Sequence, residues 1–341
     1  MPERAAGFVT GGTWCVDRNK LVEFWPAEDG MAQILAFEQR GGGSGCNFAV
    51  DIRKLDPGIP VATIGLVGDD EDGRFLLAEA DAYGIERRAL AVTAAAPTQC
   101  TDAYGSLKTG RRTHLYFQGT AALLTPDHFV GLENFAGRFF HLGLPGVHPL
   151  MDSPCGEDSN GWVSVLRKAR AAGFRTSLEL ASAGADRIAV LGRPCLPYLD
   201  YLIVNDLEIG ALAGVITARA GRTDTDAVER AIRTVAALAP LELVAAHFPT
   251  GAVAATKEGT LIRLPSIAVP SEEIVAANGA GDAFAAGTLY GVHQGWDIAM
   301  ALRLGHAAAA ASLRGLSTTG TVGTWHECLA VTGRWGTRES R

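Results

Sequence analysis

The chain has 341 residues, of which 48% are hydrophobic and 20% are charged, so it can bury a large core and is not expected to be disordered. Its net charge of −7 disfavours nucleic acid as the main partner, because binding to a phosphate backbone needs a basic surface. Six cysteines occur without a Cys-x-x-Cys pair, which disfavours a zinc site or a disulfide framework. With neither a signal-peptide pattern nor a membrane-spanning apolar run, we expect a cytoplasmic protein without a membrane partner.

Short apolar runs alternate with alanine-rich helical segments along the chain, which is typical of βαβ units and a mostly parallel sheet. We therefore expect one α/β domain over residues 1–341, with a polar, frayed tail after about residue 330. Strands are predicted at 7–10, 61–67, 139–142, 176–180, 201–204 and 241–246. Helices are predicted near 44–54, 71–83, 160–172, 206–213, 224–238, 280–293 and 297–313.

Two regions break this rhythm with the alternating polarity of hairpin strands. Residues 21–25 are expected to pair with 32–39, and residues 98–108 with 112–118 around a turn at 108–111.

The most informative segment is Asn278-Gly279-Ala280-Gly281-Asp282, which leads into a predicted helix. Small residues let a backbone approach a ligand closely, and the first helical turn offers unpaired N–H groups at the positive end of the dipole. Together they predict a cradle for an anion such as phosphate. A carboxylate there repels phosphate unless it has a task, and taking a proton from an attacking hydroxyl is such a task. Alternatively, Asp282 is only an ordinary helix N-terminal charge.

A second glycine-rich entry into a helix lies near the N-terminus, at residues 41–50. Asn47 sits about one turn into that predicted helix, where its amide can offer both a donor and an acceptor to a polyol. These two elements, in this order, resemble the ribokinase-like (PfkB) family of carbohydrate kinases. The family's Gly-Gly-x-x-x-Asn element stands here as residues 42–47, and its Asp-Thr-x-Gly-Ala-Gly-Asp element as residues 276–282.

Other segments extend the resemblance from about residue 6 to residue 325. Asn205-Asp206-Leu207-Glu208 is similar to the family's Asn-x-x-Glu element, and Asp17 follows Gly11-Gly12 where the family keeps a sugar-binding Asp. Residues 65–70 and 305–310 match as well. The resemblance implies a ribokinase-like central sheet flanked by helices. It also implies a small β-strand lid, from segments at about 17–40 and 97–120, over the sugar site; the alternative is an edge sheet used only for dimer contacts.

The resemblance also implies roles for individual residues. Asp282 becomes the catalytic base, with the N–H groups of Gly279, Ala280 and Gly281 holding the transferred phosphate. Sugar contacts are expected from Asp17, Gly42, Gly43 and Asn47, although Asp17 can also be a turn residue and Asn47 a cap. Arg112, in a Gly-x-Arg arrangement, faces a substrate carboxylate or phosphate, or is a solvated lid residue.

The cofactors that the resemblance implies are ATP and Mg²⁺. Asn205 and Glu208 are expected to hold Mg²⁺ mostly through water, since magnesium usually keeps several waters; the alternative is an N-cap with a first-turn acid. Gly251 and His306 are expected near the nucleotide, although His306 can equally be a packed core residue.

Two departures from the family pattern matter. Ala276 replaces an Asp that helps to build a monovalent-cation site in relatives, so we expect little potassium activation unless Glu272 or Glu273 substitutes. In the nucleotide segment, residues 246–251, Phe248 stands where relatives have a small residue, which predicts a rearranged loop or a differently bound phosphate donor.

The sequence thus predicts an ATP-dependent kinase acting on a hydroxyl of a small sugar or sugar acid. A nucleoside kinase is the near alternative, which base-stacking aromatic residues such as Tyr104 or Phe117 would favour. A non-catalytic sugar- or nucleotide-binding relative is the distant one, but a pure binder would not need Asp282 in its anion cradle. A homodimer formed through the lid is expected.

Overall fold

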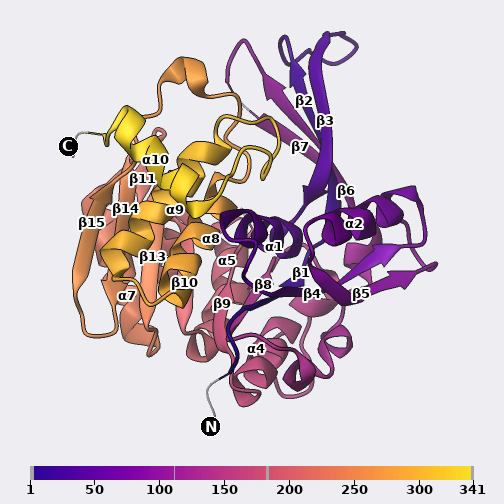
Figure 1. Ribbon diagram of the computed structural model, residues 1–341, viewed down its shortest axis with the longest axis vertical. Helices are drawn as coiled ribbons and strands as arrows, with labels where there is room; N and C mark the ends of the chain where they lie inside the picture. Colours follow the sequence, from indigo (N-terminus) through magenta and orange to yellow (C-terminus); the bar gives the residue numbers. More distant parts are fainter. Residues whose placement is uncertain (1–3, 111, 182–183, 339–341) are drawn as a thin grey trace.

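The computed structural model describes residues 4–110, 112–181 and 184–338. Its body is built on a nine-stranded sheet of order β15-β14-β13-β10-β9-β8-β1-β4-β5 (Figure 1). Every pairing from β5 through β13 is parallel, and β14 and β15 add antiparallel strands at one edge. The strands are β1 (Phe8–Gly12), β4 (Val61–Gly68), β5 (Glu86–Thr93), β8 (Phe139–Gly143), β9 (Arg175–Leu178), β10 (Tyr201–Asn205), β13 (Leu243–Phe248), β14 (Gly251–Thr256) and β15 (Leu261–Pro265).

Helices cover both faces of this sheet (Figure 1), which confirms the predicted α/β architecture of a mostly parallel sheet flanked by helices. The seven predicted helices are present within two residues of their expected bounds. The helices are α1 (Ser44–Leu55), α2 (Glu71–Ala82), α3 (Pro149–Asp152), α4 (Gly161–Ala171), α5 (Ala185–Gly192), α6 (Asp206–Ala213), α7 (Thr225–Leu238), α8 (Ala280–His293), α9 (Ile298–Ser312) and α10 (Trp325–Trp335). None of the helices in the described part of the chain has the length and hydrophobicity needed to span a bilayer.

The sheet separates two hydrophobic clusters. Side chains alternate between the faces of a strand, so Leu243 and Ala245 of β13 join the cluster with α1, α8 and α9. Val244 and Ala246 join the cluster with α4 and α7 on the other face. Because such strands are buried on both faces, they read as continuous apolar runs, which is why they could be predicted.

The expectation of a frayed tail is wrong. Helix α10 runs from Trp325 to Trp335, packs against α9 and buries Cys328. Beyond it, Thr337 forms a β-bridge with Ile267.

A separate four-stranded sheet, which we call the lid, projects from the body (Figure 1). Its order is β3-β2-β6-β7, with β2 (Cys15–Val22), β3 (Ile34–Gly42), β6 (Cys100–Ser106) and β7 (Arg112–Phe117). The predicted strand at 21–25 is wrong, because β2 starts soon after β1 and ends at Val22. β2 also pairs in parallel with β6, a long-range pairing that joins the two predicted hairpins into one sheet. Residue 111 of the expected turn lies outside the described residues. A small ribbon, β11 (Ala218–Arg219) with β12 (Arg222–Thr223), connects α6 to α7.

Candidate active site

The glycine cradle forms at the start of α8, as predicted from its composition. Gly279 is the N-cap and has a φ of 70°, which residues other than glycine rarely adopt. A Cβ at this position would lie 2.6 Å from Thr318. No side chain caps the helix, so its first N–H groups, from Ala280 onward, have no capping partner. An uncapped helix N-terminus entered through glycine is suited to bind an anion.

The two glycine-rich elements meet at a hydrogen bond between their polar side chains. Asn47 Nδ2 donates to Asp282 Oδ2 over 2.6 Å, although the two residues are 235 positions apart. On its other side, Asn47 accepts a hydrogen bond from the Thr318 hydroxyl over 2.9 Å. Asn47 lies on α1, is 3% exposed and is held in one orientation, so it fixes the carboxylate of Asp282.

Acidic groups gather around Asp282. Burial and the neighbouring Glu179, to which Asp282 is hydrogen-bonded, hold the pKa of Asp282 well above its ordinary value. Burial raises the pKa values of Glu179 and Glu208 to about 7, and Glu208 also feels the charge of Asp282. Glu179 follows β9 and Glu208 lies on α6, so separate elements bring these carboxyl groups to one edge of the sheet.

Glu179 is held in place by a buried histidine. His141 Nε2 lies 3.1 Å from Glu179 Oε2, and His141 Nδ1 lies 2.9 Å from the hydroxyl of Ser177. The imidazole stacks on Phe48 with ring centroids 4.0 Å apart. Burial lowers the pKa of His141 to about 3, so the ring is neutral at physiological pH and leaves the charge of the acidic cluster uncompensated.

The residues expected to hold Mg²⁺ form a reciprocal cap at the start of α6. Asn205 Oδ1 accepts from the N–H of Glu208 over 2.8 Å, and Glu208 Oε2 accepts from the N–H of Asn205 over 3.0 Å. The predicted N-cap alternative is therefore present, and it orients both side chains beside the acidic cluster. A divalent cation fits this chemistry, because it would relieve the repulsion among Asp282, Glu179 and Glu208. Among the described residues, no group of three or more Asp, Glu, His or Cys side chains is arranged to hold a metal ion.

Asp17 lies within β2 and faces the loop that leads into α1, so the turn alternative is wrong for this residue. A Cβ on Gly42 would come within 2.1 Å of the Asp17 carboxylate. Gly43 has a φ of 85°, and a Cβ there would strike Thr13. Burial, and to a smaller extent the charge of Asp282, raise the pKa of Asp17 to about 7. Asp17, Gly42, Gly43 and Asn47 therefore line one region next to the cradle, as the sequence predicted.

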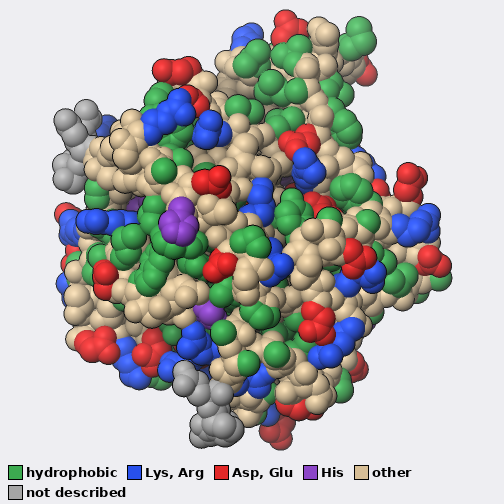
Figure 2. All heavy atoms as spheres, viewed as in Figure 1, with side chains coloured by type: hydrophobic (Ala, Val, Ile, Leu, Met, Phe, Trp, Pro, Cys, Tyr) green, Lys and Arg blue, Asp and Glu red, His purple; other side chains and the backbone are tan. Residues whose placement is uncertain are grey.

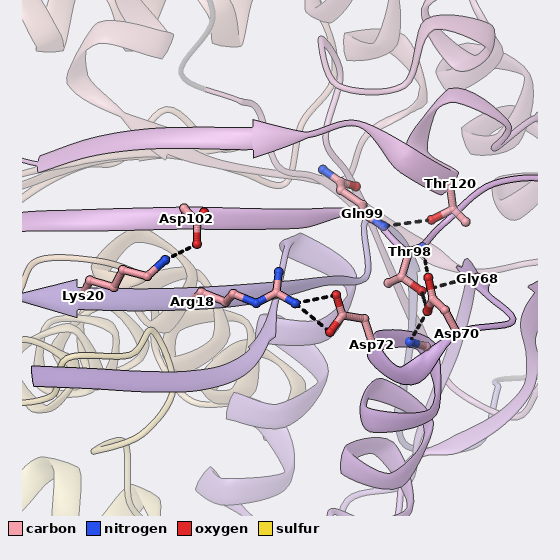
Figure 3. Close-up of polar contacts among 10 residues, drawn as sticks. Arg18, Lys20, Gly68, Asp70, Asp72, Thr98, Gln99, Asp102 and Thr120 are labelled. Carbon is pink, nitrogen blue, oxygen red and sulfur yellow. Dashed lines mark hydrogen bonds and ion pairs between the residues drawn. The ribbon is translucent and has the colours of Figure 1, made fainter. Parts of the chain in front are cut away.

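The lid is anchored to the body by charged contacts beside Asp17 (Figure 3). Arg18 of β2 makes a two-pronged ion pair with Asp72 of α2, at 2.7 and 2.8 Å. Asp70 caps α2 by accepting from Gly73 N and also accepts from the N–H and hydroxyl of Thr98, at 2.6–2.8 Å. These contacts hold the two lid segments, entering β2 and β6, against the same helix.

The predicted nucleotide segment is a tight hairpin between β13 and β14, in which Phe248 pairs with Gly251. A Cβ on Gly251 would come within 2.5 Å of Leu264 O, so glycine is required for strand packing there. The side chain of Phe248 does not face the cradle. Strand alternation turns its side chain into the α7 core, where it is 8% exposed, and His247 faces the cradle, 3.3 Å from a Cβ built on Gly281.

His306 is not brought to the cradle. It is 6% exposed on α9, hydrogen-bonds the backbone of Leu264 and packs edge-on against Phe284, with ring centroids 5.0 Å apart. The geometry matches the packed-core alternative. Arg112, in contrast, reaches from β7 to Asn278, directly before the cradle.

Glu179, His141 and His247 were missed in the sequence. Each belongs to a parallel strand or follows its carboxyl end, where ligands of open α/β sheets bind, and that position was the available signal. For His247, alternation along 243–248 would have separated it from Phe248.

Known proteins resemble the chain, some over nearly its full length. A model described as pfkB family carbohydrate kinase matches residues 9–324. A 5-dehydro-2-deoxygluconokinase of Listeria innocua is 26% identical over 345 residues, covering 96% of each chain. An adenosine kinase of Schizosaccharomyces pombe is 36% identical over 116 residues, 33% of each chain.

Solved structures share the fold. A ribokinase of Arabidopsis thaliana, complexed with ribose and ATP, superposes with a TM-score of 0.74 at 20% identity, covering 96% of this chain and 98% of that one. A ribokinase of Giardia lamblia gives a TM-score of 0.76 at 21% identity, covering 95% and 99%. Because the family model spans nearly all of the sequence and includes both glycine-rich elements, the chain belongs to the pfkB family of carbohydrate kinases.

Proposed function

We propose that the chain transfers the γ-phosphate of ATP, with Mg²⁺, to a hydroxyl group of a small sugar or sugar acid. The observation that carries this proposal is the hydrogen bond between Asn47 and Asp282 at the mouth of the glycine cradle. It places a carboxylate, an amide suited to a polyol and an anion-binding helix terminus together, which a kinase needs and a simple sugar-binding protein does not.

In the proposed reaction, Asp282 takes the proton of the acceptor hydroxyl while the oxygen of that hydroxyl forms a bond to the γ-phosphorus. The bond from that phosphorus to the β-phosphate oxygen breaks, and ADP leaves. The N–H groups at Gly279, Ala280 and Gly281 stabilise the charge on the transferred group. Mg²⁺, when bound, neutralises phosphate charge; Asn205 and Glu208 would hold it through water, and Glu179 lies close enough to contribute its charge.

Acceptor binding is assigned to Asp17, Asn47 and the backbone at Gly42 and Gly43. Arg112 adds a positive charge on the lid, which favours an acidic acceptor. The Listeria innocua relative, named for a sugar acid and aligned over 96% of this chain, supports the same class. A nucleoside acceptor is the second candidate, supported by the local 36% identity to an adenosine kinase.

For the nucleotide we assign the β13–β14 hairpin at Gly251, with His247 facing the phosphates. His306 is not assigned a contact with the nucleotide; it supports this region only by packing on Phe284 of α8. We also propose that the protein works in the cytoplasm as a homodimer joined through its lids.

The decisive variant is Asp282→Asn, which keeps size and hydrogen bonding but removes the base. Turnover should fall roughly 10²–10⁴-fold, while acceptor binding by calorimetry stays within a few-fold. Near-normal kcat in this variant would refute the assignment of Asp282.

The acceptor class can be read from a thermal-shift screen with Mg²⁺ and an ATP analogue present. A ligand that binds only the folded state raises Tm by an amount set by its concentration over Kd. Sugar acids, neutral sugars and nucleosides form the three arms. A shift with adenosine alone would replace the sugar assignment with the nucleoside one.

A further inference from the structure

The side-chain amide of Asn278 is hydrogen-bonded by side chains from two strands of the lid. Arg112 Nη1 of β7 donates to Asn278 Oδ1 over 2.5 Å. Asn278 Nδ2 donates to Asn19 Oδ1 of β2 over 3.2 Å. His114 of β7 hydrogen-bonds Asn278 as well. Both the oxygen and the nitrogen of this side chain are therefore engaged by the lid.

The pairing of the lid strands explains how one residue reaches β2 and β7, which are not neighbours. Asn19 pairs with Ala103 of β6, and Ala103 pairs with His114, so the three form one row across the sheet. Paired residues present their side chains on the same face. Ala103, in the middle of the row, carries only a methyl group. This leaves a space over Ala103, between Asn19 and His114, that the side chain of Asn278 can occupy.

The same residue is joined directly to the cradle. Asn278 precedes Gly279, whose left-handed conformation starts α8 and packs against Thr318. Thr318 in turn donates to Asn47, which holds Asp282. A lid docked on Asn278 therefore fixes the chain at the point where the phosphate-binding N–H groups begin.

We propose that Asn278 is a positioning residue that couples lid closure to the phosphate cradle, so that nucleotide binding and lid closure favour each other. The proposal rests on the function above, which assigns the donor phosphate to the cradle and the acceptor to the lid. Its basis is that the bonds of Arg112 and Asn19 to Asn278 join the lid to the chain directly before the cradle, so a lid that moves away from the body must break them. By linkage, a nucleotide that orders the cradle must then close the lid, and a closed lid must strengthen nucleotide binding equally.

The test is hydrogen exchange of β7 amides, residues 112–117, with and without a non-hydrolysable ATP analogue and Mg²⁺. In the wild-type protein, the analogue should slow exchange in β7 several-fold. In Asn278→Ala, β7 exchange should no longer respond to the analogue, and calorimetry should show analogue binding that is weaker by no more than the several-fold factor lost from the exchange response.

A second variant changes the lid side of this contact. Ala103→Leu fills the space over Ala103 without changing the cradle, and it should also abolish the slowing of β7 exchange by the analogue. Thr113→Ala, on the opposite face of β7 from Arg112 and His114, is the matched control and should keep it. An unchanged response in Asn278→Ala, or none in wild type that binds the analogue, overturns the coupling alone. Failure of wild type to bind the analogue overturns the proposed function together with it.

Discussion

At the residue scale, the site is defined by acids whose charge is poorly compensated. Asp17, Glu179 and Glu208 have pKa values of about 7, and that of Asp282 is also raised; burial is the first cause for each. Such groups bind protons that ordinary carboxyl groups have already lost. A hydroxyl acceptor and a hydrated cation are the partners that this arrangement suits.

Asp17 allows a test of this reading through stability. Its native pKa of about 7 exceeds the ordinary value of 3.8 for an aspartate side chain, so between these pH values the native state binds more protons than the unfolded chain. The free energy of unfolding therefore falls as pH rises through this window. Asp17→Asn removes the effect, and its stability relative to wild type should rise by about 1–3 kcal/mol from pH 4.5 to pH 8.5.

Urea unfolding of the ligand-free protein at the two pH values measures this difference. The exposed Asp69→Asn serves as the control and should track the wild type. Parallel pH profiles for Asp17→Asn and wild type would show that the carboxyl group is solvated and ionised in the native state.

Much of the candidate site could be predicted at this scale, because glycine and helix-start patterns are local. Asn47 and Asp282 were found since each follows a glycine-rich turn. Glu179 was missed because its position after a strand is only a general signal, and its closeness to Asp282 depends on how β9 is placed in the sheet, which no local pattern reveals. His247 was missed for a simpler reason: the alternation of side chains along 243–248 was not used to place His247 and Phe248 on opposite faces of the strand.

At the element scale, α2 connects the body to the lid. Its N-cap, Asp70, accepts from Gly73 N and twice from Thr98, at the entry to β6, and its first turn carries Asp72, which pairs with Arg18 of β2 (Figure 3). These bonds hold the pKa of Asp70 below its ordinary value, through Thr98 first and Gly73 next, although burial opposes them. The helix cap is therefore also an anchor for the lid.

We expect Asp70→Ala to lower the free energy of unfolding by about 1–3 kcal/mol, because a cap is lost and N–H groups are left unpaired. The stabilisation by Asp70 is present above its unfolded pKa and is lost as pH falls through the native one, so the variant should approach wild type in acid. Denaturant unfolding at pH 7 and pH 3 tests both statements. Asp69→Ala, next in the chain but outside the helix cap, is the control, and an equal loss in it would remove the capping argument.

The lid also shows where element prediction ends. Alternating polarity marked the lid strands, but β2 begins at Cys15, where buried residues continue from β1 without a break in hydrophobicity. The parallel pairing of β2 with β6 joins positions more than eighty residues apart, and no turn residue signals it. Helix α10 was missed although Thr324 and Glu327 form a capping box and apolar residues occupy 328–331.

At the scale of the whole molecule, the lid leaves an apolar surface uncovered. Phe37, Leu115 and Phe117 are 53–57% exposed, and the strand register places them on the face opposite Asn19 and His114. Hydrophobic side chains are visible over the projecting lid in Figure 2. This face also carries the ion pair between Lys20 and Asp102, but its exposed apolar side chains are expected to be buried against another protein surface.

A second copy of the chain is the partner we propose, and the charge of one lid position tests it. Replacing Leu115 by Lys puts a further charge among the exposed apolar side chains of this face. In sedimentation, the wild type should have about twice the chain mass of 35.8 kDa, and Leu115→Lys should shift toward the single-chain mass. Because Leu115 is exposed, the folded monomer should lose less than about 0.5 kcal/mol.

Val190→Lys, at an exposed position on α5, should leave the mass unchanged and controls for added charge. A wild type that sediments as one chain at micromolar concentration would refute the dimer. If Leu115→Lys separates the subunits and also raises the KM for the acceptor while leaving that for ATP unchanged, the dimer stabilises the closed lid, because the variant touches neither Asp17 nor the cradle. Separation without any change in KM would instead make the apolar face a surface for assembly alone.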